Sequence, residues 1–180
     1  MPGSGVLVVL ATKAEAAHVP TGLRTVITGL GKTAAAVATT RAILEERPSL
    51  VINVGSAGAL RDGLHGLFEI GRVLNHDMSA DIVRTLGYDP REWLTVSDHE
   101  TVLASGDVFV TDPVVRERLA LQAHLVDMEG YAVAYACHEL GVPLRMVKHV
   151  SDQADESAMD WPDLVELSAK AIGAWLEGNL

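Results

Sequence analysis

Short apolar runs rich in β-branched residues alternate along this chain with alanine-rich segments of helical character. The first units are a run at Val6 to Leu10, a run at Thr25 to Thr28, a helix from about Lys32 to Arg47, and a run at Val51 to Val54. This βαβ order is typical of a partly parallel sheet that has helices on its faces. Pro48 ends the helix before an almost continuously apolar strand, as expected when both sheet faces are covered. The alternation predicts an α/β fold with a mixed central sheet flanked by helices.

The second half of the chain continues this pattern after one irregular stretch. Between Gly58 and Asp98, glycines punctuate short apolar pieces, which we interpret as hairpin and loop. The later units are a strand at Thr101 to Ser105, a helix after Pro113, a strand at Leu125 to Val126, a helix from Glu129 to Leu140, a strand at Leu144 to Val150, and a helix from about Pro162 to Leu176. Since no repeat or linker interrupts 180 residues of 48% hydrophobic content, we expect one domain over residues 1–180.

Charge and the N-terminal sequence exclude several classes of partner. The formal net charge is −10, and a protein that holds nucleic-acid phosphates needs clustered Lys and Arg instead. Met1 to Ser4 has no basic residue, and the apolar run that follows is too short for a signal sequence or a membrane span. We therefore expect a cytoplasmic protein that binds a small molecule, with no nucleic-acid or membrane partner.

Cysteine and histidine usage argues against metal and disulfide sites. Cys137 is the only cysteine, and it lies in an apolar helical stretch where a buried thiol is expected. His99 is followed by Glu100, but the metal-binding template requires a second histidine where Leu103 stands. The sequence predicts no metal and no cofactor.

Carboxylates and glycines recur directly after the apolar runs. They are Glu15, Gly55-Ser-Ala-Gly58, Ser105-Gly-Asp107, Asp127-Met-Glu129 and Ser151-Asp152. Taken singly, each has a structural explanation: a tight turn at Gly55 or Gly58, a helix cap at Asp127, or an ordered loop at Asp152. In open α/β sheets, however, ligands bind beyond the carboxyl ends of the strands. The recurrence therefore favours one binding site at that edge.

Five ordered segments carry a resemblance to a known family. They are Gly29-Leu-Gly-Lys-Thr-Ala-Ala-Ala36, Val51-Ile-Asn-Val-Gly-Ser-Ala-Gly58, Ala104-Ser-Gly-Asp-Val-Phe-Val110, Val126-Asp-Met-Glu-Gly130 and Val150-Ser-Asp-Gln-Ala-Asp155. On these segments the chain resembles the purine nucleoside phosphorylase and nucleosidase superfamily, in particular its methylthioadenosine/S-adenosylhomocysteine nucleosidase branch. The resemblance implies a nucleoside phosphorylase-like fold, hydrolysis of a purine nucleoside, and a homodimer or larger homo-oligomer.

The resemblance also implies a role for each candidate site residue. Glu15 matches the general base that activates water, Asp152 the acid that engages the purine N7, and Glu129 a carboxylate that contacts the ribose. Further matches are Met128 for the ribose, Phe109 and Val110 for the purine, Ser56, Ala57 and Gly58 for a glycine-rich turn beside the sugar, and Ser151 for a supporting position. Phe68, Met159 and Trp161 are additional candidates for apolar walls, unless they pack in the core.

These roles agree with the chemistry of N-glycoside cleavage. A purine leaves more readily when its N7 is protonated, a task for Asp152. The ribose gains positive charge as the bond lengthens, so a carboxylate at Glu129 binds the transition state more tightly than the ground state. A further carboxylate must deprotonate the attacking water, as in inverting glycosidases, and Glu15 is the candidate.

Alternative functions remain open at this stage. A phosphate-dependent phosphorylase would need cationic side chains, yet Asn53 stands where the phosphorylases of the family typically place an arginine, which favours water. Gly31-Lys-Thr33 suggests a nucleotide-binding P-loop, although Val26 occupies the position of its first glycine. A non-catalytic nucleoside-binding protein is the third alternative. The identity of the nucleoside and its 5′ substituent is open in every case.

Overall fold

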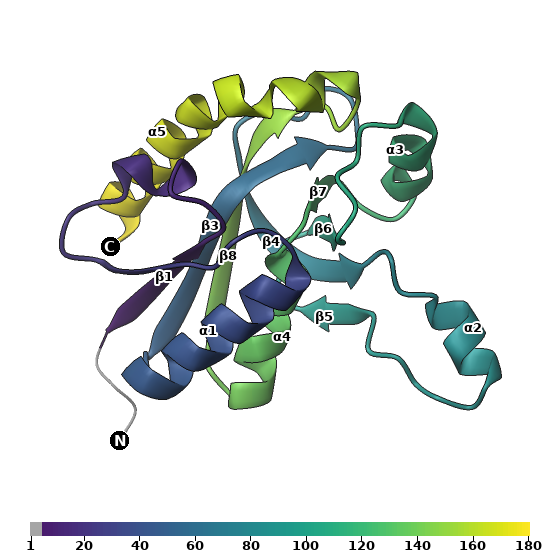
Figure 1. Cartoon of the computed structure of the whole chain (residues 1–180), viewed down its shortest axis with the longest axis horizontal. Helices are drawn as coiled ribbons and strands as arrows, with labels where there is room; N and C mark the ends of the chain where they lie inside the picture. The colour runs from purple at the N-terminus through teal and green to yellow at the C-terminus, as the bar shows by residue number, and fades with distance from the viewer. Residues whose placement is uncertain (1–4) are drawn as a thin grey trace.

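A mixed eight-stranded sheet forms the centre of the molecule in the computed structural model, which describes residues 5–180 (Figure 1). The first four residues of the predicted domain lie outside the described residues. The strands are β1 (Val6–Leu10), β2 (Arg24–Ile27), β3 (Leu50–Ala59), β4 (Leu67–Asn75), β5 (Trp93–Thr95), β6 (Thr101–Ser105), β7 (Leu125–Asp127) and β8 (Leu144–Asp152). The helices are α1 (Lys32–Glu46), α2 (Ala80–Thr85), α3 (Pro113–Ala120), α4 (Gly130–Leu140) and α5 (Trp161–Asn179), with short 3-10 helices η1 (Glu15–His18) and η2 (Glu156–Asp160).

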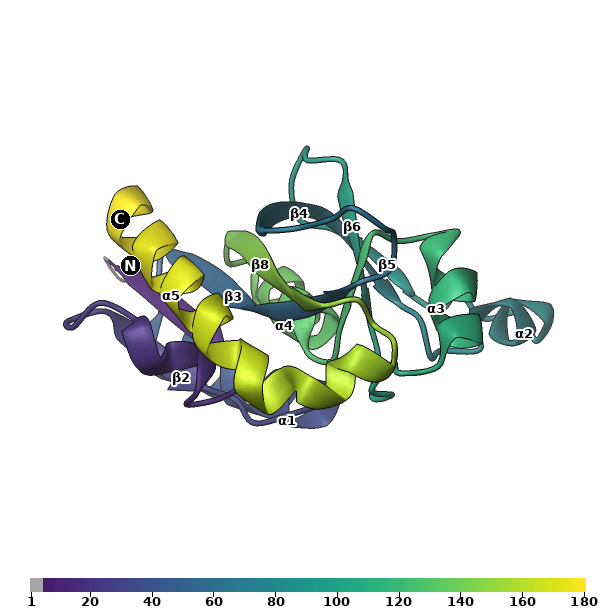
Figure 2. The ribbon, with the colours of Figure 1, turned by 90° about the horizontal axis from the view of Figure 1, so that it is seen from above.

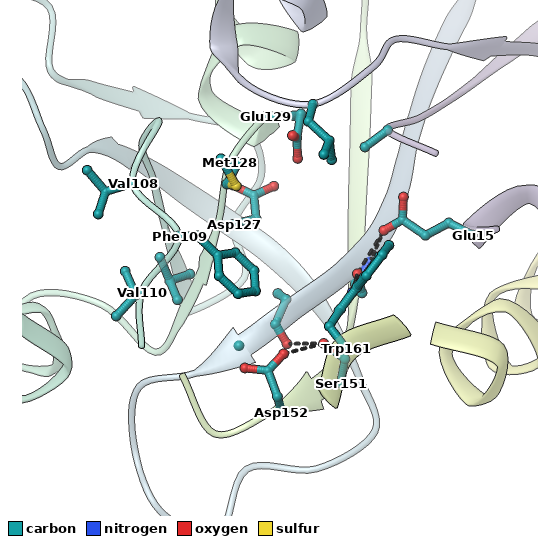
Figure 3. Close-up of a pocket in the computed structure, with 16 residues that line it drawn as sticks. Glu15, Val108, Phe109, Val110, Asp127, Met128, Glu129, Ser151, Asp152 and Trp161 are labelled. Atoms are coloured by element: carbon teal, nitrogen blue, oxygen red, sulfur yellow. Dashed lines mark hydrogen bonds between the residues drawn. The ribbon is translucent and has the colours of Figure 1, made fainter. Parts of the chain in front are cut away.

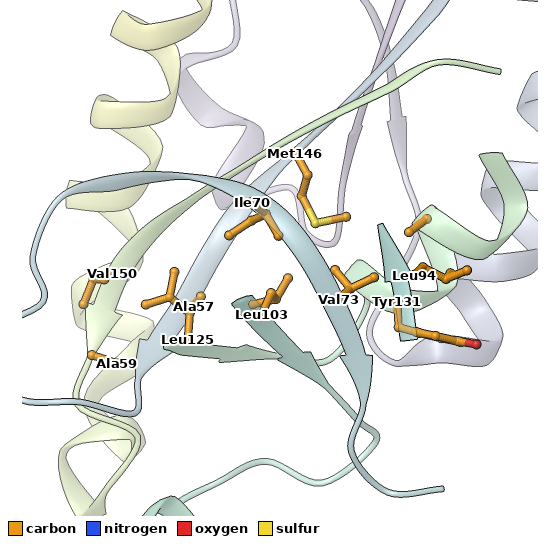
Figure 4. Close-up of a cluster of buried hydrophobic side chains, with 11 residues drawn as sticks. Ala57, Ala59, Ile70, Val73, Leu94, Leu103, Leu125, Tyr131, Met146 and Val150 are labelled. Atoms are coloured by element: carbon orange, nitrogen blue, oxygen red, sulfur yellow. The ribbon is translucent and has the colours of Figure 1, made fainter. Parts of the chain in front are cut away.

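Five of the strands close into a ring. β3 pairs with β8, β8 with β4, β4 with β6, β6 with β7, and β7 with β3. One buried cluster draws side chains from all five strands (Figure 4): Ala57, Ala59, Ile70, Val73, Leu103, Leu125, Met146 and Val150. Since closure pairs each of these strands on both sides, none of them has a free edge along the ring. β1 and β2 extend the sheet in parallel from β3, and β5 joins β4.

Helices cover both faces of β1. Leu7 and Val9 of β1 pack with α1 and α4, whereas Val8 and Leu10 pack with α5. Successive strand residues point to opposite faces, so a strand covered on both sides has to be apolar throughout. This explains the continuous apolar run that the sequence shows, and the predicted flanked mixed sheet is confirmed. Cys137 is buried in the α4 layer, where burial raises the pKa of its thiol to about 12.

Two sequence interpretations are wrong. The glycine-rich segment from Gly55 to Gly58 is not a turn, because β3 continues to Ala59 and pairs with β8 along its length. The stretch from Gly58 to Asp98 is more than hairpin and loop, since it contains β4, α2 and β5. Gly71 interrupts the apolar pattern of β4 because a Cβ there would lie 1.6 Å from the His99 carbonyl oxygen. At Gly71, therefore, the backbone of the segment at His99 passes close to the backbone of β4.

A slender arm carries α2 away from the body of the protein (Figures 1 and 2). Its exposed residues include large apolar side chains, namely Met78, Ile82, Leu86 and Tyr88. Within residues 5–180, no helix is both long and apolar enough to cross a membrane.

Candidate active site

One pocket lies where β1, β3, β6, β7 and β8 end, and it contains every site residue that the sequence predicts (Figure 3). The predicted residues in its lining are Glu15, Ser56, Ala57, Gly58, Phe109, Val110, Met128, Glu129, Ser151 and Asp152. The lining also includes Ala11, Leu30, Val108, Val126, Asp127 and Trp161. Segments far apart in the sequence thus meet beyond the carboxyl ends of the strands, where ligands of α/β proteins bind.

Glu15 is buried and is held by four donors. Its Oε2 accepts from the backbone N–H and the hydroxyl of Thr12, both at 3.0 Å, and its Oε1 accepts from the N–H and the hydroxyl of Ser56, both at 2.8 Å. The side chain of Glu15 is therefore fixed in one orientation at the pocket wall.

Trp161 begins α5 and closes the same wall. Its indole N–H donates to Ser56 Oγ at 2.9 Å. Of the candidate apolar walls, only Trp161 lines the pocket, because Phe68 packs against the core cluster and Met159 is 69% exposed.

Glu129 stands immediately before α4 and is buried. Its Oε1 accepts from the N–H of Gly31 at 2.7 Å, across the start of α1. Burial, reinforced by the neighbouring Asp127, raises the pKa of Glu129 to about 7, against the opposing effects of the Gly31 N–H and Lys148. Glu129 can therefore change its charge near neutral pH.

Lys148 and Asp127 form a buried ion pair that the sequence analysis missed. Lys148 Nζ lies 2.9 Å from Asp127 Oδ2, and both side chains are no more than 3% exposed. Burial alone would lower the pKa of Lys148, but the carboxylates of Asp127, Glu129 and Glu15 together raise it, so the ammonium stays charged. The available clue was a lysine inside the apolar run of β8, since a buried lysine requires paired carboxylates.

A bulge in β8 brings Ser151 and Asp152 to the pocket together. Val150 pairs with Ala57 and Asp152 pairs with Gly58, so Ser151 is the extra residue. Consecutive residues of a regular strand face opposite sides, and a bulge re-aims them. Ser151 Oγ donates to Asp152 Oδ2 at 2.6 Å, and the N–H of Ala154 donates to Oδ1 at 2.9 Å.

Gly58 allows this approach. A Cβ at Gly58 would lie 2.9 Å from Asp152 Oδ1 and 2.9 Å from the Cβ of Ala154. The segment that the sequence analysis interpreted as a turn is thus a strand whose glycine makes room for the carboxylate.

The mouth of the pocket is apolar and open. Phe109 and Val110 follow β6, with Val110 buried and Phe109 47% exposed. Leu30 and Val108 at the same mouth are 63% and 52% exposed. Figure 3 shows the Phe109 ring and Asp152 bordering the same space. A flat aromatic ligand fits such walls, with Asp152 able to hydrogen-bond its edge.

The N-terminus of α1 does not offer a phosphate cradle. The N–H of Gly31 donates to Glu129, and the N–H of Lys32 donates to Asp107 Oδ1 at 2.7 Å. Lys32 Nζ contacts Asn75 and Asp77. A P-loop uses such groups for phosphates, whereas here carboxylates occupy them. The structure therefore does not support the nucleotide-binding alternative.

Comparisons with known proteins identify a matching family and several relatives. The family model described as "Phosphorylase superfamily" matches residues 20–177. The 5′-methylthioadenosine/S-adenosylhomocysteine nucleosidase of Shewanella oneidensis is 30% identical over 160 residues, covering 72% of this chain and 66% of that relative. The chain thus spans slightly less than two thirds of that relative's length.

Two solved structures from Helicobacter pylori have the same fold. One is a 5′-methylthioadenosine/S-adenosylhomocysteine nucleosidase, with a TM-score of 0.87, 24% identity, and coverage of 98% of this chain and 97% of the other. The second is a futalosine hydrolase, with a TM-score of 0.85, 24% identity and the same coverages.

Proposed function

Because the chain belongs to the phosphorylase superfamily, we propose that it is a nucleosidase that hydrolyses the N-glycosidic bond of a purine nucleoside. The observation that carries the proposal is the meeting of Glu15, Glu129 and Asp152 around one apolar pocket. The named relatives described above support the same reaction class. The proposal includes a cytoplasmic location, where a lone buried thiol such as Cys137 stays reduced.

Each carboxylate has a separate task in the proposed mechanism. Asp152 donates a proton, or a strong hydrogen bond, to the purine N7 as the C–N bond breaks and its electron pair passes to the base. Ionised Glu129 accepts hydrogen bonds from the ribose hydroxyls while positive charge develops on the sugar. Glu15 removes a proton from the water that attacks the anomeric carbon. The products are free purine and a ribose derivative with a hydroxyl at that carbon.

The lining favours water over phosphate as the nucleophile. Among the described residues that line the pocket, four are carboxylic acids and none is Arg or Lys. A phosphate dianion would meet repulsion there, because the buried cation Lys148 is already paired with Asp127. Asn53 is buried, and its side-chain amide donates to the Val9 carbonyl at 3.0 Å. The Asn53 side chain is therefore engaged within the sheet and does not line the pocket.

The test is product analysis with and without phosphate. Purified protein is incubated with 5′-methylthioadenosine, S-adenosylhomocysteine, futalosine, adenosine and inosine, and the products are separated by chromatography. We expect free base from at least one nucleoside at a rate independent of phosphate. Ribose 1-phosphate as the product would reassign the protein to the phosphorylases. Saturable binding of a nucleoside without turnover would favour a binding protein.

The activity should depend on the charge of Glu129. Because its pKa is raised to about 7, the carboxyl is mostly neutral below that pH, and the ionised form accepts the stronger, charge-assisted hydrogen bonds from the ribose hydroxyls. We therefore expect kcat/KM to rise with pH through about 7. The pH dependence of kcat/KM reports pKa values of the free enzyme, which is the state that the structure describes. Steady-state rates from about pH 5.5 to 8.5 measure it. If kcat/KM of the Glu129→Gln variant rises over the same pH range, the titrating group is not Glu129.

We also propose that the protein is a homodimer or a larger homo-oligomer. The support is the apolar surface left exposed on the α2 arm, at Ile82, Leu86 and Tyr88, and at the pocket mouth. Large apolar side chains left exposed on one arm are of the kind that mark an interaction site. Light scattering of the purified protein gives the mass, and Ile82→Glu should lower it if the arm packs against a second copy.

A further inference from the structure

The contacts of Trp161, Ser56 and Glu15 form a hydrogen-bond chain with only one possible direction. An indole N–H can only donate, and a serine hydroxyl has one proton with which to donate. Because Trp161 Nε1 lies 2.9 Å from Ser56 Oγ, that oxygen accepts from the indole. The single hydroxyl proton then points to Glu15 Oε1, 2.8 Å away. In Figure 3, Trp161 and Glu15 lie at the same side of the pocket, and dashed lines mark hydrogen bonds at the Glu15 carboxylate.

We infer that Trp161 is a positioning residue for the proposed general base Glu15, acting through the Ser56 hydroxyl. The inference rests on the proposed function, in which Glu15 takes the proton of the attacking water. With one lone-pair position of its oxygen engaged by the indole, Ser56 has fewer orientations for its single proton, and the favoured one is toward Glu15 Oε1. Glu15 then keeps the orientation that its buried donors define, and no reorganisation is needed when water arrives.

The position of Trp161 in the chain links the proposed acid Asp152 to the proposed base Glu15. Asp152 ends β8, the short helix η2 follows, and Trp161 begins α5. The indole contact therefore ties the segment that follows the proposed acid to the strand β3 and, through it, to the proposed base. A displacement of this segment would disturb the Glu15 orientation as well as the pocket wall.

A double-mutant cycle tests the coupling. Trp161→Phe keeps an aromatic ring but removes the N–H, and Ser56→Ala removes the hydroxyl while the Ser56 N–H still donates to Glu15. We expect each single variant to lower kcat about ten-fold, with a smaller change in KM. We expect the double variant to lose no more than the larger single loss. Additive losses would show that Trp161 acts independently of Ser56 and would overturn the inference.

Trp175→Phe is the matched control, because Trp175 packs over Arg145, away from the pocket lining. Its kcat and KM should equal those of the unmodified protein. A ten-fold loss in this control would mean that tryptophan replacement acts through general packing, and it would overturn the inference.

An NMR measurement tests the hydrogen bond without reference to activity. The chain has three tryptophans, so ¹⁵N labelling gives three indole N–H signals, of which Trp161→Phe removes one. We expect Ser56→Ala to shift that signal and leave the other two in place. An unmoved Trp161 signal would disprove the chain of hydrogen bonds. A shifted signal in a protein that cleaves no nucleoside would instead disprove the proposed function and, with it, the positioning role.

Discussion

Replacing Asp152 by asparagine is expected to lower kcat by about 10²–10⁴-fold, the range that general acids contribute. Asparagine cannot supply a proton to the purine N7, so the base must leave as an anion. KM should change little, because the side chain should keep its orientation in the pocket. The amide retains an oxygen that can accept from the Ala154 N–H, which lies 2.9 Å from Oδ1 of Asp152 in the unmodified protein. Steady-state kinetics on the preferred nucleoside of the panel measures both constants.

Asp160→Asn is the control for this substitution. Asp160 is exposed and precedes α5 without a side-chain cap, so its replacement should leave kcat unchanged. Thermal unfolding of both variants should match that of the unmodified protein, since neither change alters size. Turnover within a few-fold of normal in Asp152→Asn would remove Asp152 from the role of acid.

Replacing Lys148 by methionine is expected to lower the free energy of unfolding by about 3–5 kcal/mol, the cost of breaking a buried ion pair on one side. Asp127, Glu129 and Glu15 would then share a buried region without their cation. A domain is stabilised by only about 5–15 kcal/mol, so this loss is a large share of the total. Urea unfolding followed by circular dichroism measures it.

The loss should depend on pH in a defined direction. Burial already raises the pKa of Glu129, so without Lys148 its carboxyl takes up a proton more readily, which relieves part of the repulsion at acid pH. The destabilisation of Lys148→Met should thus be larger at about pH 8 than at about pH 5.

Adding Asp127→Asn to Lys148→Met should restore part of the stability. Lys170→Met, an exposed residue paired with Glu166, should change it by less than about 1 kcal/mol. Equal effects of the two lysine replacements would show that the buried pair is not what stabilises this region.

Much of the fold could be predicted from the period and composition of the segments. The strands at Val6–Leu10 and Thr101–Ser105 match the predicted ranges, because both are short runs that contain β-branched and apolar residues. The first long helix ends where Pro48 requires it to end, with Arg47 in the left-handed region at a φ of 48°. The proposed site residues also meet in one pocket, since strand ends in this fold class gather at one edge.

The rest depends on contacts between distant segments, which local patterns do not contain. Gly58 and Gly71 resemble turn formers in the sequence, but each is small because another part of the chain passes close by. Lys148 resembles an exposed strand residue until β8 is paired with β3 and Asp127 is brought beneath it. The closure of the strands into a ring likewise follows from the pairing of β8 with both β3 and β4, which no single segment reveals.

That ring has a consequence for how a nucleoside enters and leaves. β3, β7 and β8 each carry part of the pocket and are each paired on both sides, so they cannot separate without breaking a continuous circuit of backbone hydrogen bonds. The ring therefore acts as a rigid frame, and gating falls to the segments attached to it. The loop after β6, which carries the half-exposed Val108 and Phe109, borders the opening. Exchange of substrate and product is expected to proceed by hinging of this loop, at a rate that changes in its sequence can tune while the carboxylates stay in place.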